Sequence, residues 1–417
     1  MLKVFTASWA LLLGMMLLMV GNGVQGTLLG IRGAIEGFST VQMSIVMSAY
    51  FAGFLFGSRM APEMIRRVGH VRVFAALGSL ISAVLVLYAA IPDWIVWTLL
   101  RVLIGVCFAG VYVTAESWLN NTASNENRGQ ALSLYMIVQM LGIIAAQALI
   151  NFADPAGFLL FIIPSVLVSL AFAPILLSVS PAPTFGTTRS MSIRELYHVS
   201  PLGVVGTFLM GGVFAAMFGM TAVWGTQAGL SVLEISIFTG AIYSGGLLFQ
   251  YPIGWLSDKV DRRKLLVVVA LIGTAGGAVA VLFDLPFAGL LGVALIIGGI
   301  SNPLYSLLVA YTNDYLEHDQ MAAASGGLLF VNGVGAIIGP LVIGWLLGAV
   351  GPSGFFLYII FLTLMLALYA IWRMTQRTAP SVAETGPYAA VTPSVSAATV
   401  DAIYSELYEQ QTEADRK

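Results

Sequence analysis

Two arginines in apolar surroundings are the side chains of this chain best suited to bind a charged group. Arg101 follows Asp93 by two helical turns, which places it roughly 11 Å along an apolar run. A guanidinium at that depth in lipid needs amide or hydroxyl partners, a water-filled cavity or an anionic ligand. Arg32 lies closer to the end of its own apolar run and could line the outer mouth of a pathway. Both are therefore predicted to lie along a substrate pathway.

Neutral polar side chains also occur in the middle of apolar runs. They are Asn22, Gln25, Gln139, Tyr243, Gln250, Asn302, Tyr305 and Asn332. In lipid each of them needs a hydrogen-bond partner. Such a residue either joins two helices or contacts a solute, and the sequence leaves both roles open.

Carboxylates are missing from the middle of every apolar run. None of the 20 acidic residues lies there, and Glu116 and Asp314 are the deepest. A pocket for an organic cation normally needs a buried carboxylate, so neutral or anionic solutes are favoured. A coupling proton or ion also needs a titratable group in its path, and these two residues are the candidates for it.

The composition is that of a membrane protein. Of the 417 residues, 59% are apolar and only 9% are charged, whereas soluble domains carry about 25% charged residues. The net charge of −2 indicates no nucleic-acid partner. A single cysteine, Cys107, excludes an intrachain disulfide and a CxxC site. With no Walker loop, nucleophile–histidine pair or metal-ligand spacing, we expect neither an enzyme nor a metal or other cofactor.

Twelve stretches are long and apolar enough to span a bilayer as helices. They cover residues 8–30, 41–60, 72–91, 94–115, 131–152, 157–177, 201–224, 233–255, 265–283, 286–310, 324–348 and 354–373. With both termini in the cytosol, 16 of the 18 Lys and Arg residues fall in cytosolic segments, and only Arg32 and Arg101 do not. The positive-inside rule therefore predicts this orientation in a bacterial inner membrane.

The two halves of the helical region resemble each other. Tyr50-Phe-Ala-Gly-Phe-Leu-Phe and Tyr243-Ser-Gly-Gly-Leu-Leu-Phe each lead into a basic loop, with an offset of about 193 residues. The prediction is an all-α integral membrane protein with a six-helix bundle over residues 1–177 and a second over 201–374. A cytosolic linker, 178–200, joins them. Residues 375–417 are rich in Ala, Ser, Thr, Pro and Glu and are expected to form a disordered cytosolic tail, with a short helix near 401–411 as the alternative.

The loop over residues 254–264 resembles the signature loop of the major facilitator superfamily, G-x-L-a-D-r-x-G-r-k, with Asp261 in place of the second Gly. The first half keeps Gly57 and Gly69-His-Val-Arg72 but lacks the Asp, and Arg101-Val-Leu-Ile-Gly is similar to the family's R-x-x-x-G element. The Gly333–Pro340 stretch is similar to an antiporter element that normally lies in the fifth span. The combination of Glu116-Ser-Trp-Leu-Asn120, Asn127-Arg-Gly129 and Val68-Gly-His-Val-Arg72 is similar to a YcaD-like group of bacterial permeases.

The resemblance implies the superfamily fold, twelve helices in two six-helix pseudo-repeats, and a cytosolic gate at the signature loop. The residues that match or face this gate are Gly254, Asp258, Arg262, Arg263, Asp314, Glu116 and Arg72. We expect Asp314 to contact the Arg262 cluster, and Glu116 to contact Arg66, Arg67 or Arg72. Asp258 should accept from the N-terminal end of a neighbouring helix, and Gly254 should allow close approach of a helix.

In the family, the first, tenth and eleventh spans line the cavity, which favours Asn22, Gln25, Asn302, Tyr305 and Asn332 as pathway residues. Tyr243, which begins the second copy of the repeated segment, is also predicted to be a pathway residue. The expected function is secondary active transport of a small neutral or anionic organic solute by alternating access. The partners would be that solute, membrane lipid and a coupling proton or ion. The alternatives are a non-transporting sensor or assembly factor, and a lipid flippase on the same scaffold.

Overall fold

The structure is a computed structural model that describes residues 2–122, 128–177, 191–377, 385–396, 399–400 and 403–407. Eleven apolar helices in these residues are long enough to cross a membrane. The sixth predicted span is the helix α6 (Leu159–Leu177), which is a shorter apolar helix, Leu159–Pro174, over the residues whose side chains are described. Every predicted span therefore coincides with a helix, and the chain is a multi-pass membrane protein.

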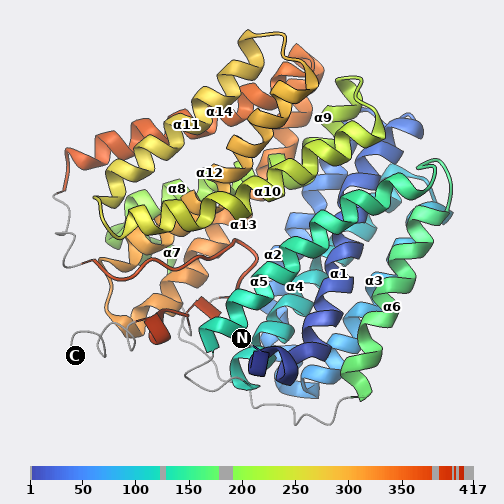
Figure 1. Cartoon of the computed structure of the whole chain (residues 1–417), viewed down its shortest axis with the longest axis horizontal. Helices are drawn as coiled ribbons and strands as arrows, with labels where there is room; N and C mark the ends of the chain where they lie inside the picture. Colours follow the sequence, from blue (N-terminus) through green and yellow to red (C-terminus); the bar gives the residue numbers. More distant parts are fainter. Residues whose placement is uncertain are drawn as a thin grey trace. The chain divides into compact units, whose positions relative to one another are not determined.

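The first half of the chain contains six long helices, shown from blue to green in Figure 1. They are α1 (Leu2–Ile35), α2 (Thr40–Val68), α3 (His70–Ala90), α4 (Trp94–Thr122), α5 (Arg128–Leu149), which continues into the 3-10 turn η2 (Ile150–Phe152), and α6. Helix α1 packs beside α5 and α6, and α2 packs beside α4. Several of these helices extend beyond the predicted spans because a hydropathy window detects the apolar segment, not the helix end.

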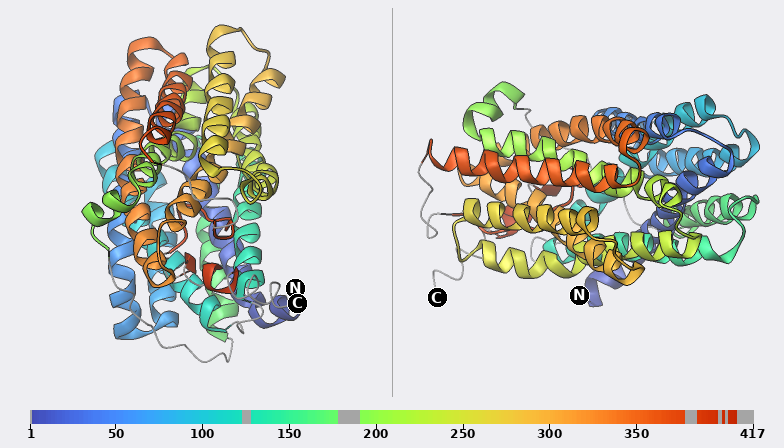
Figure 2. Two further views of the ribbon diagram at one scale, coloured as in Figure 1. Left: turned by 90° about the vertical axis from the view of Figure 1, so that its left-hand side faces the viewer. Right: turned by 90° about the horizontal axis from the view of Figure 1, so that it is seen from above.

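The second half repeats this arrangement after the short helix α7 (Ile193–Val199). Its first span consists of α8 (Pro201–Ala215), the π-helical turn η3 (Ala216–Met220) and α9 (Thr221–Gln227). Then follow α10 (Val232–Ser257), α11 (Arg262–Leu282), α12 (Phe287–Asn313), α13 (His318–Val350) and α14 (Ser353–Met374). Helices α11 and α14 lie side by side, as do α8 and α13 (Figures 1 and 2).

The contacts divide the chain into two compact units, which differ in one place from the predicted bundles. The N-terminal unit is residues 1–187 plus 218–240, and the C-terminal unit is residues 188–217 plus 241–417. The segment 218–240 joins the N-terminal unit because α9 packs on α1, where Gly30 leaves room for Ala222 and the backbone of Val223. The grouping by contacts and the predicted bundles therefore differ over residues 218–240. Most of the predicted linker, 178–190, lies outside the described residues.

The turn before the second span of each half is built in the same way. Gly37 and Gly229 have φ values of 77° and 76°, which favour glycine. Two residues later a serine caps the next helix: Ser39 accepts from the backbone N–H of Gln42 at 3.2 Å, and Ser231 from that of Glu234 at 3.3 Å. The Gln and Glu side chains accept in return from the serine N–H groups, both at 2.8 Å. Both turns are therefore capping boxes, and they support the internal repeat.

Glycines also set the closest helix crossing in each half. A Cβ on Gly105 of α4 would lie 2.2 Å from the Tyr50 carbonyl oxygen of α2, and a Cβ on Gly298 of α12 would lie 1.9 Å from the Ile242 carbonyl oxygen of α10. Gly105 and Gly298 are equivalent positions under the repeat offset of about 193. In both units, backbone approaches backbone because no side chain separates the helices.

The C-terminal segment differs from the predicted solvated tail. Residues 385–391 form an extended chain along the C-terminal unit, drawn in red in Figure 1, and Val391 is fully buried. A turn over residues 392–395 follows. A short helical turn over residues 403–407 buries Tyr404. The prediction of disorder is therefore wrong for these segments, because polar backbone groups that looked solvated are bonded to the helices. The rest of the predicted helix near 401–411 lies outside the described residues.

Candidate functional site

Arg101 lies inside the N-terminal unit and not at its lipid surface. Only 2% of the residue is exposed. One terminal nitrogen donates to the Gln25 side-chain oxygen at 2.9 Å, and the other contacts the Met47 sulfur at 3.3 Å. The guanidinium carbon lies 4.8 Å from the centre of the Tyr50 ring. These partners are neutral, and the Nε atom has no hydrogen-bond partner among the described residues. The cation is thus held in place without being neutralised.

A chain of hydrogen bonds leads from Arg101 along α1. Gln25, which accepts from Arg101, donates to the Asn22 side-chain oxygen at 3.0 Å. Asn22 donates to the Tyr112 hydroxyl of α4 at 3.2 Å, and that hydroxyl donates to the Met19 sulfur at 3.2 Å. Two of the predicted pathway residues therefore form one polar track with Arg101. Each of its amides has a partner, as a polar group in lipid requires.

The R-x-x-x-G spacing explains why Arg101 reaches this position. Gly105 lies one turn further along α4 and lets that helix touch the α2 backbone at Tyr50. Residues four apart share one helix face, so the close crossing brings Arg101 over the Tyr50 ring. Within the R-x-x-x-G element, the glycine thus allows the close approach of α4 to α2, and this approach lets the arginine contact Tyr50.

Arg32 has partners at the end of α1 and in a neighbouring loop. Its Nε donates to Glu36 at 2.6 Å on the same helix, and its Nη1 donates to the carbonyl oxygens of Pro155 and Ala156. These contacts tie the end of α1 to the loop that follows η2. A place for Arg32 at the outer mouth of a solute pathway stays a prediction.

In the C-terminal unit, one predicted pathway residue joins two helices. Asn332 of α13 donates to the Thr207 carbonyl oxygen of α8 at 3.0 Å. Gly211 and Gly335 bring the same two helices close together, since a Cβ on either would lie 2.0 Å from a carbonyl oxygen of the other helix. The amide therefore stabilises a helix pair, which was the alternative role left open by the sequence.

The other predicted polar residues of this unit lie on α10 and α12. Asn302, Tyr305 and Tyr243 are 7%, 4% and 8% exposed. Asn302 lies beside Gly246, whose missing side chain leaves room for the amide. Gln250 of α10 donates to the Ser306 hydroxyl of α12 at 3.0 Å. The two helices therefore share a buried polar strip, and solute contact there stays a prediction.

The end of the C-terminal unit that carries the signature loop holds a buried ion pair. Arg262 donates to Asp314, as predicted, and their side chains are 2% and 3% exposed. Arg262 also donates to the Ser257 hydroxyl at 3.1 Å. Burial raises the pKa of Asp314 above its usual range, despite the opposing effect of Arg262. Asp314 is therefore the buried carboxyl of this cluster, whereas the Asp258 side chain is 49% exposed.

Two signature residues have partners other than those predicted. The Asp258 carboxylate accepts from the backbone N–H of Tyr388 at 3.0 Å and from Arg262 at 3.4 Å. The space beside Gly254 holds the Tyr388 ring, 2.6 Å from where a Cβ would be. The predicted partner helix is thus replaced at both positions by the C-terminal segment. No sequence motif marks that segment, so the residues predicted for the gate did not include Tyr388.

The departure at Asp261 has a structural explanation. Its φ of −57° requires no glycine, and its carboxylate accepts from the backbone N–H of Arg263 at 2.9 Å and so caps α11. Arg263 also bonds to Asp261 through its side chain at 3.1 Å and donates to the Arg377 carbonyl oxygen at 2.7 Å. Burial acts to raise the pKa of Asp261, but the bonds from Arg263 outweigh it and lower that pKa.

The predicted ion pairs of Glu116 do not form. Arg66 and Arg67 pair with Glu63, one turn earlier on α2, at 2.8 and 2.6 Å. Arg72 is exposed, and Glu116 is fully buried and accepts from the Tyr135 hydroxyl at 3.4 Å. A neighbour on the same helix face was available to the arginines, whereas Glu116 lies deeper. The i, i+3 and i, i+4 spacing of Glu63 was the signal that could have predicted this.

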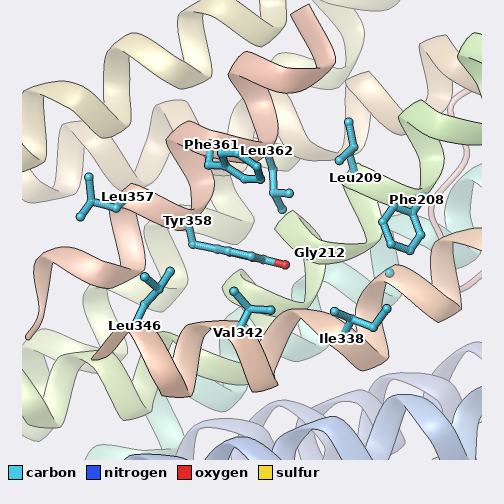
Figure 3. A pocket seen from close by; sticks show the side chains of 11 residues that line it. Phe208, Leu209, Gly212, Ile338, Val342, Leu346, Leu357, Tyr358, Phe361 and Leu362 are labelled. Carbon is cyan, nitrogen blue, oxygen red and sulfur yellow. The ribbon is translucent and has the colours of Figure 1, made fainter. Parts of the chain in front are cut away.

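An apolar crevice of about 410 Å³ lies within the C-terminal unit, between α8, α13 and α14. Figure 3 shows Tyr358 projecting from α14 toward Gly212, with Val342 and Ile338 of α13 on one side and Phe208 of α8 beyond. The Tyr358 hydroxyl is the only polar side-chain group among its lining residues. This surface suits hydrocarbon and lacks the groups that would bind a charged solute.

The sequence profile described as Major Facilitator Superfamily matches residues 11–244 and 204–400, which together cover most of the chain. The chain belongs to the Major Facilitator Superfamily. One curated relative is the "Uncharacterized MFS-type transporter YcaD" of Escherichia coli (strain K12 / DH10B), 30% identical over 339 residues, or 79% of this chain and 86% of the relative. The protein of that name from Salmonella heidelberg (strain SL476) is 28% identical over 334 residues, with the same two coverages.

Solved structures show the same fold at low sequence identity. The nucleoside transporter NupG matches with a TM-score of 0.74 and 14% identity, over 90% of this chain and 100% of that one. A bacterial homologue of the human lysosomal transporter Spinster, in an inward-facing and occupied conformation, matches with a TM-score of 0.73 and 16% identity, over 90% and 97%. The YcaD-like resemblance and the superfamily fold predicted from the sequence are thus confirmed, and the chain is placed among membrane transporters.

Proposed function

We propose that this transporter carries a small anionic or neutral organic solute across the inner membrane by alternating access, with Arg101 in the solute pathway. The supporting observation is the environment of Arg101: a fully buried guanidinium with neutral partners and one unpartnered N–H. A buried cation is costly unless it is paired, so an anionic group that enters this site is stabilised by it. A carboxylate would also be matched by the planar fork of the guanidinium.

The polar track beside Arg101 supports the proposal that neutral solutes are also carried. Gln25 and Asn22 carry amide groups that both donate and accept, and Tyr112 adds a hydroxyl. Such groups bind hydroxyl or carbonyl groups on a solute without requiring charge. The orientation with both termini in the cytosol rests on the distribution of Lys and Arg. Asp314, with its raised pKa, is the proposed acceptor if a proton is coupled to transport.

The test begins with binding to the purified protein, because a ligand that binds the folded state raises its unfolding temperature. A panel of organic anions and neutral metabolites is screened first, and hits are measured by counterflow in proteoliposomes. Arg101→Lys keeps the charge but loses the fork, so it should lower kcat/KM for an anionic hit about tenfold or more. Arg101→Ala should abolish its transport.

Arg66→Ala is the matched control, since its side chain is 63% exposed and pairs only with Glu63 at the surface. It should transport at the rate of the unmodified protein. Transport of the anionic hit by Arg101→Ala at an unchanged rate would refute the proposed role. Binding of a solute without flux in any condition would favour the sensor alternative.

Lipid handling is a second candidate function, favoured by the apolar crevice between α8, α13 and α14. A crevice lined by hydrocarbon can hold an acyl chain. Scrambling of a fluorescent phospholipid in proteoliposomes tests it directly, and Gly212→Phe, which fills the crevice, should stop that scrambling. No scrambling above that of protein-free vesicles would exclude this candidate.

A further inference from the structure

The C-terminal segment begins its contacts at the buried ion pair. The Gly386 N–H donates to Asp314 at 3.1 Å, and the Gly386 carbonyl oxygen accepts from Arg262. The backbone of this one residue thus bonds to both members of a pair whose side chains are almost fully buried. Burying two charges is costly unless their remaining donors and acceptors are satisfied, and the N–H and C=O of Gly386 satisfy one of each.

Tyr388 follows one face of α10. Gln250, Gly254 and Asp258 are spaced by four residues, so they form one stripe along the helix and its end. Gln250 donates to the Tyr388 hydroxyl at 3.0 Å, Gly254 leaves room for its ring, and Asp258 accepts from its N–H at 3.0 Å. The three residues therefore contact Tyr388 along its whole length, at the hydroxyl, the ring and the backbone N–H.

Val391 is held by a single hydroxyl of α12. Its N–H donates to Ser306 at 3.1 Å, and its carbonyl oxygen accepts from the same hydroxyl at 2.8 Å. Beyond Tyr388, buried and less buried residues alternate: Ala389, Val391, Pro393 and Val395 are buried, and the residues between them are not. Up to Val391 the segment is extended, and residues 392–395 then form a turn in which the Val395 N–H donates to the Thr392 carbonyl oxygen at 3.0 Å. The segment is therefore held by specific backbone hydrogen bonds as well as by apolar burial.

We propose that the C-terminal unit contains a binding site for an extended peptide, formed by Gln250, Gly254, Asp258, Arg262, Ser306 and Asp314, and that residues 385–391 of the chain are its resident ligand. The site takes backbone N–H and C=O groups, a tyrosine and small apolar side chains. It shares Gly254, Asp258 and Arg262 with the signature loop. The docked segment consequently holds the loop and the polar strip of α10 and α12, and its release frees both for the transport cycle.

The occupancy of the site can be measured without knowing the solute. In a Cys107→Ser background, Val391→Cys is compared with Ala390→Cys, because Val391 is fully buried and its neighbour is exposed. In membranes, a permeant maleimide should label residue 390 at least tenfold faster than residue 391. After unfolding in dodecyl sulfate the two rates should be equal. Equal rates in the native membrane would overturn the proposal.

The identity of the site residues is tested in the same assay. Ser306→Ala removes the hydroxyl that bonds both groups of Val391, and it should raise the labelling rate at position 391 at least fivefold. Asn332→Ala is the control, because Asn332 bonds to Thr207 within the same unit and does not contact the segment. Unchanged protection in Ser306→Ala would show that these groups do not form the site.

Release of the segment is tested by locking it. A disulfide between Ser306→Cys and Val391→Cys should stop uptake of a transported solute, and a reductant should restore it. Full uptake by the oxidised, cross-linked protein would refute release during the cycle, while the labelling result would still stand. Absence of uptake by the Cys107→Ser protein with Ser306 and Val391 unmodified would count against the proposed transport function and not against the peptide site.

Discussion

The close crossing of α10 and α12 allows a sharp test on two glycines of the same helix. A Cβ on Gly298 would lie 1.9 Å from the Ile242 carbonyl oxygen, whereas a Cβ on Gly292 has nothing within 4 Å. Gly298→Ala should therefore destabilise the C-terminal unit, and Gly292→Ala should not. Both substitutions gain the same helix propensity, so the difference between them reports the crossing alone.

The magnitude follows from the required movement. A Cβ rarely approaches another atom within 3.0 Å, so Gly298→Ala must separate the two backbones by at least about 1.1 Å (3.0 − 1.9 Å). Overpacking of this kind costs about 1–3 kcal/mol. Alanine in place of a helical glycine contributes about 1 kcal/mol of stabilisation at either position. Relative to Gly292→Ala, the Gly298→Ala variant should thus be less stable by about 1–3 kcal/mol.

Thermal unfolding followed by tryptophan fluorescence, in one detergent, measures this difference. For a unit of about 200 residues each kcal/mol shifts the midpoint by roughly 2–4 °C, so the midpoint of Gly298→Ala should lie about 2–12 °C below that of Gly292→Ala. An equal or higher midpoint for Gly298→Ala would show that the helices can separate freely. The equivalent Gly105→Ala should act in the same direction, because its Cβ would lie 2.2 Å from the Tyr50 carbonyl oxygen.

Three further predictions concern charged groups. Asp314→Asn should lower the unfolding midpoint more than Asp258→Asn, because the first leaves a buried guanidinium without its carboxylate and the second acts on a side chain that is 49% exposed; equal shifts would contradict this. The pKa of Asp261 is lowered in the folded state, so its stabilising effect is full above the unfolded pKa of about 3.9 and is lost as the pH falls through the folded value. The midpoint difference between the unmodified protein and Asp261→Asn should accordingly shrink from pH 6 to pH 3, and a growing difference would reverse the assignment. In intact cells, Lys259→Cys should react only with reagents that cross the membrane, and labelling by an impermeant reagent would refute the proposed orientation.

The local rules of the sequence account for the helices and the repeat. Apolar length sets the spans, and the serine and glycine signals at Ser39 and Ser231 set the turns between them. The depth of Arg101 along an apolar run was enough to place it in the interior, since lipid excludes an unpartnered guanidinium. The pairing of Asp314 with Arg262 also followed, from the signature loop and the equivalence of the two halves. The spans, the turns and the burial of Arg101 depend on residues close in sequence or on the surrounding lipid. They do not depend on details of side-chain packing.

Tertiary structure decided which partner each polar group has. Glu63 pairs with Arg66 and Arg67 because it shares their helix face, and the buried Glu116 accepts from Tyr135. Arg32 donates to two carbonyl oxygens in the loop after η2, and no sequence motif predicts these acceptors. The tail shows the largest difference, because its composition predicts solvation. Its backbone groups meet Ser306, Asp258 and Asp314, residues at least 70 positions away, and only the folded helices bring those acceptors and donors to one surface.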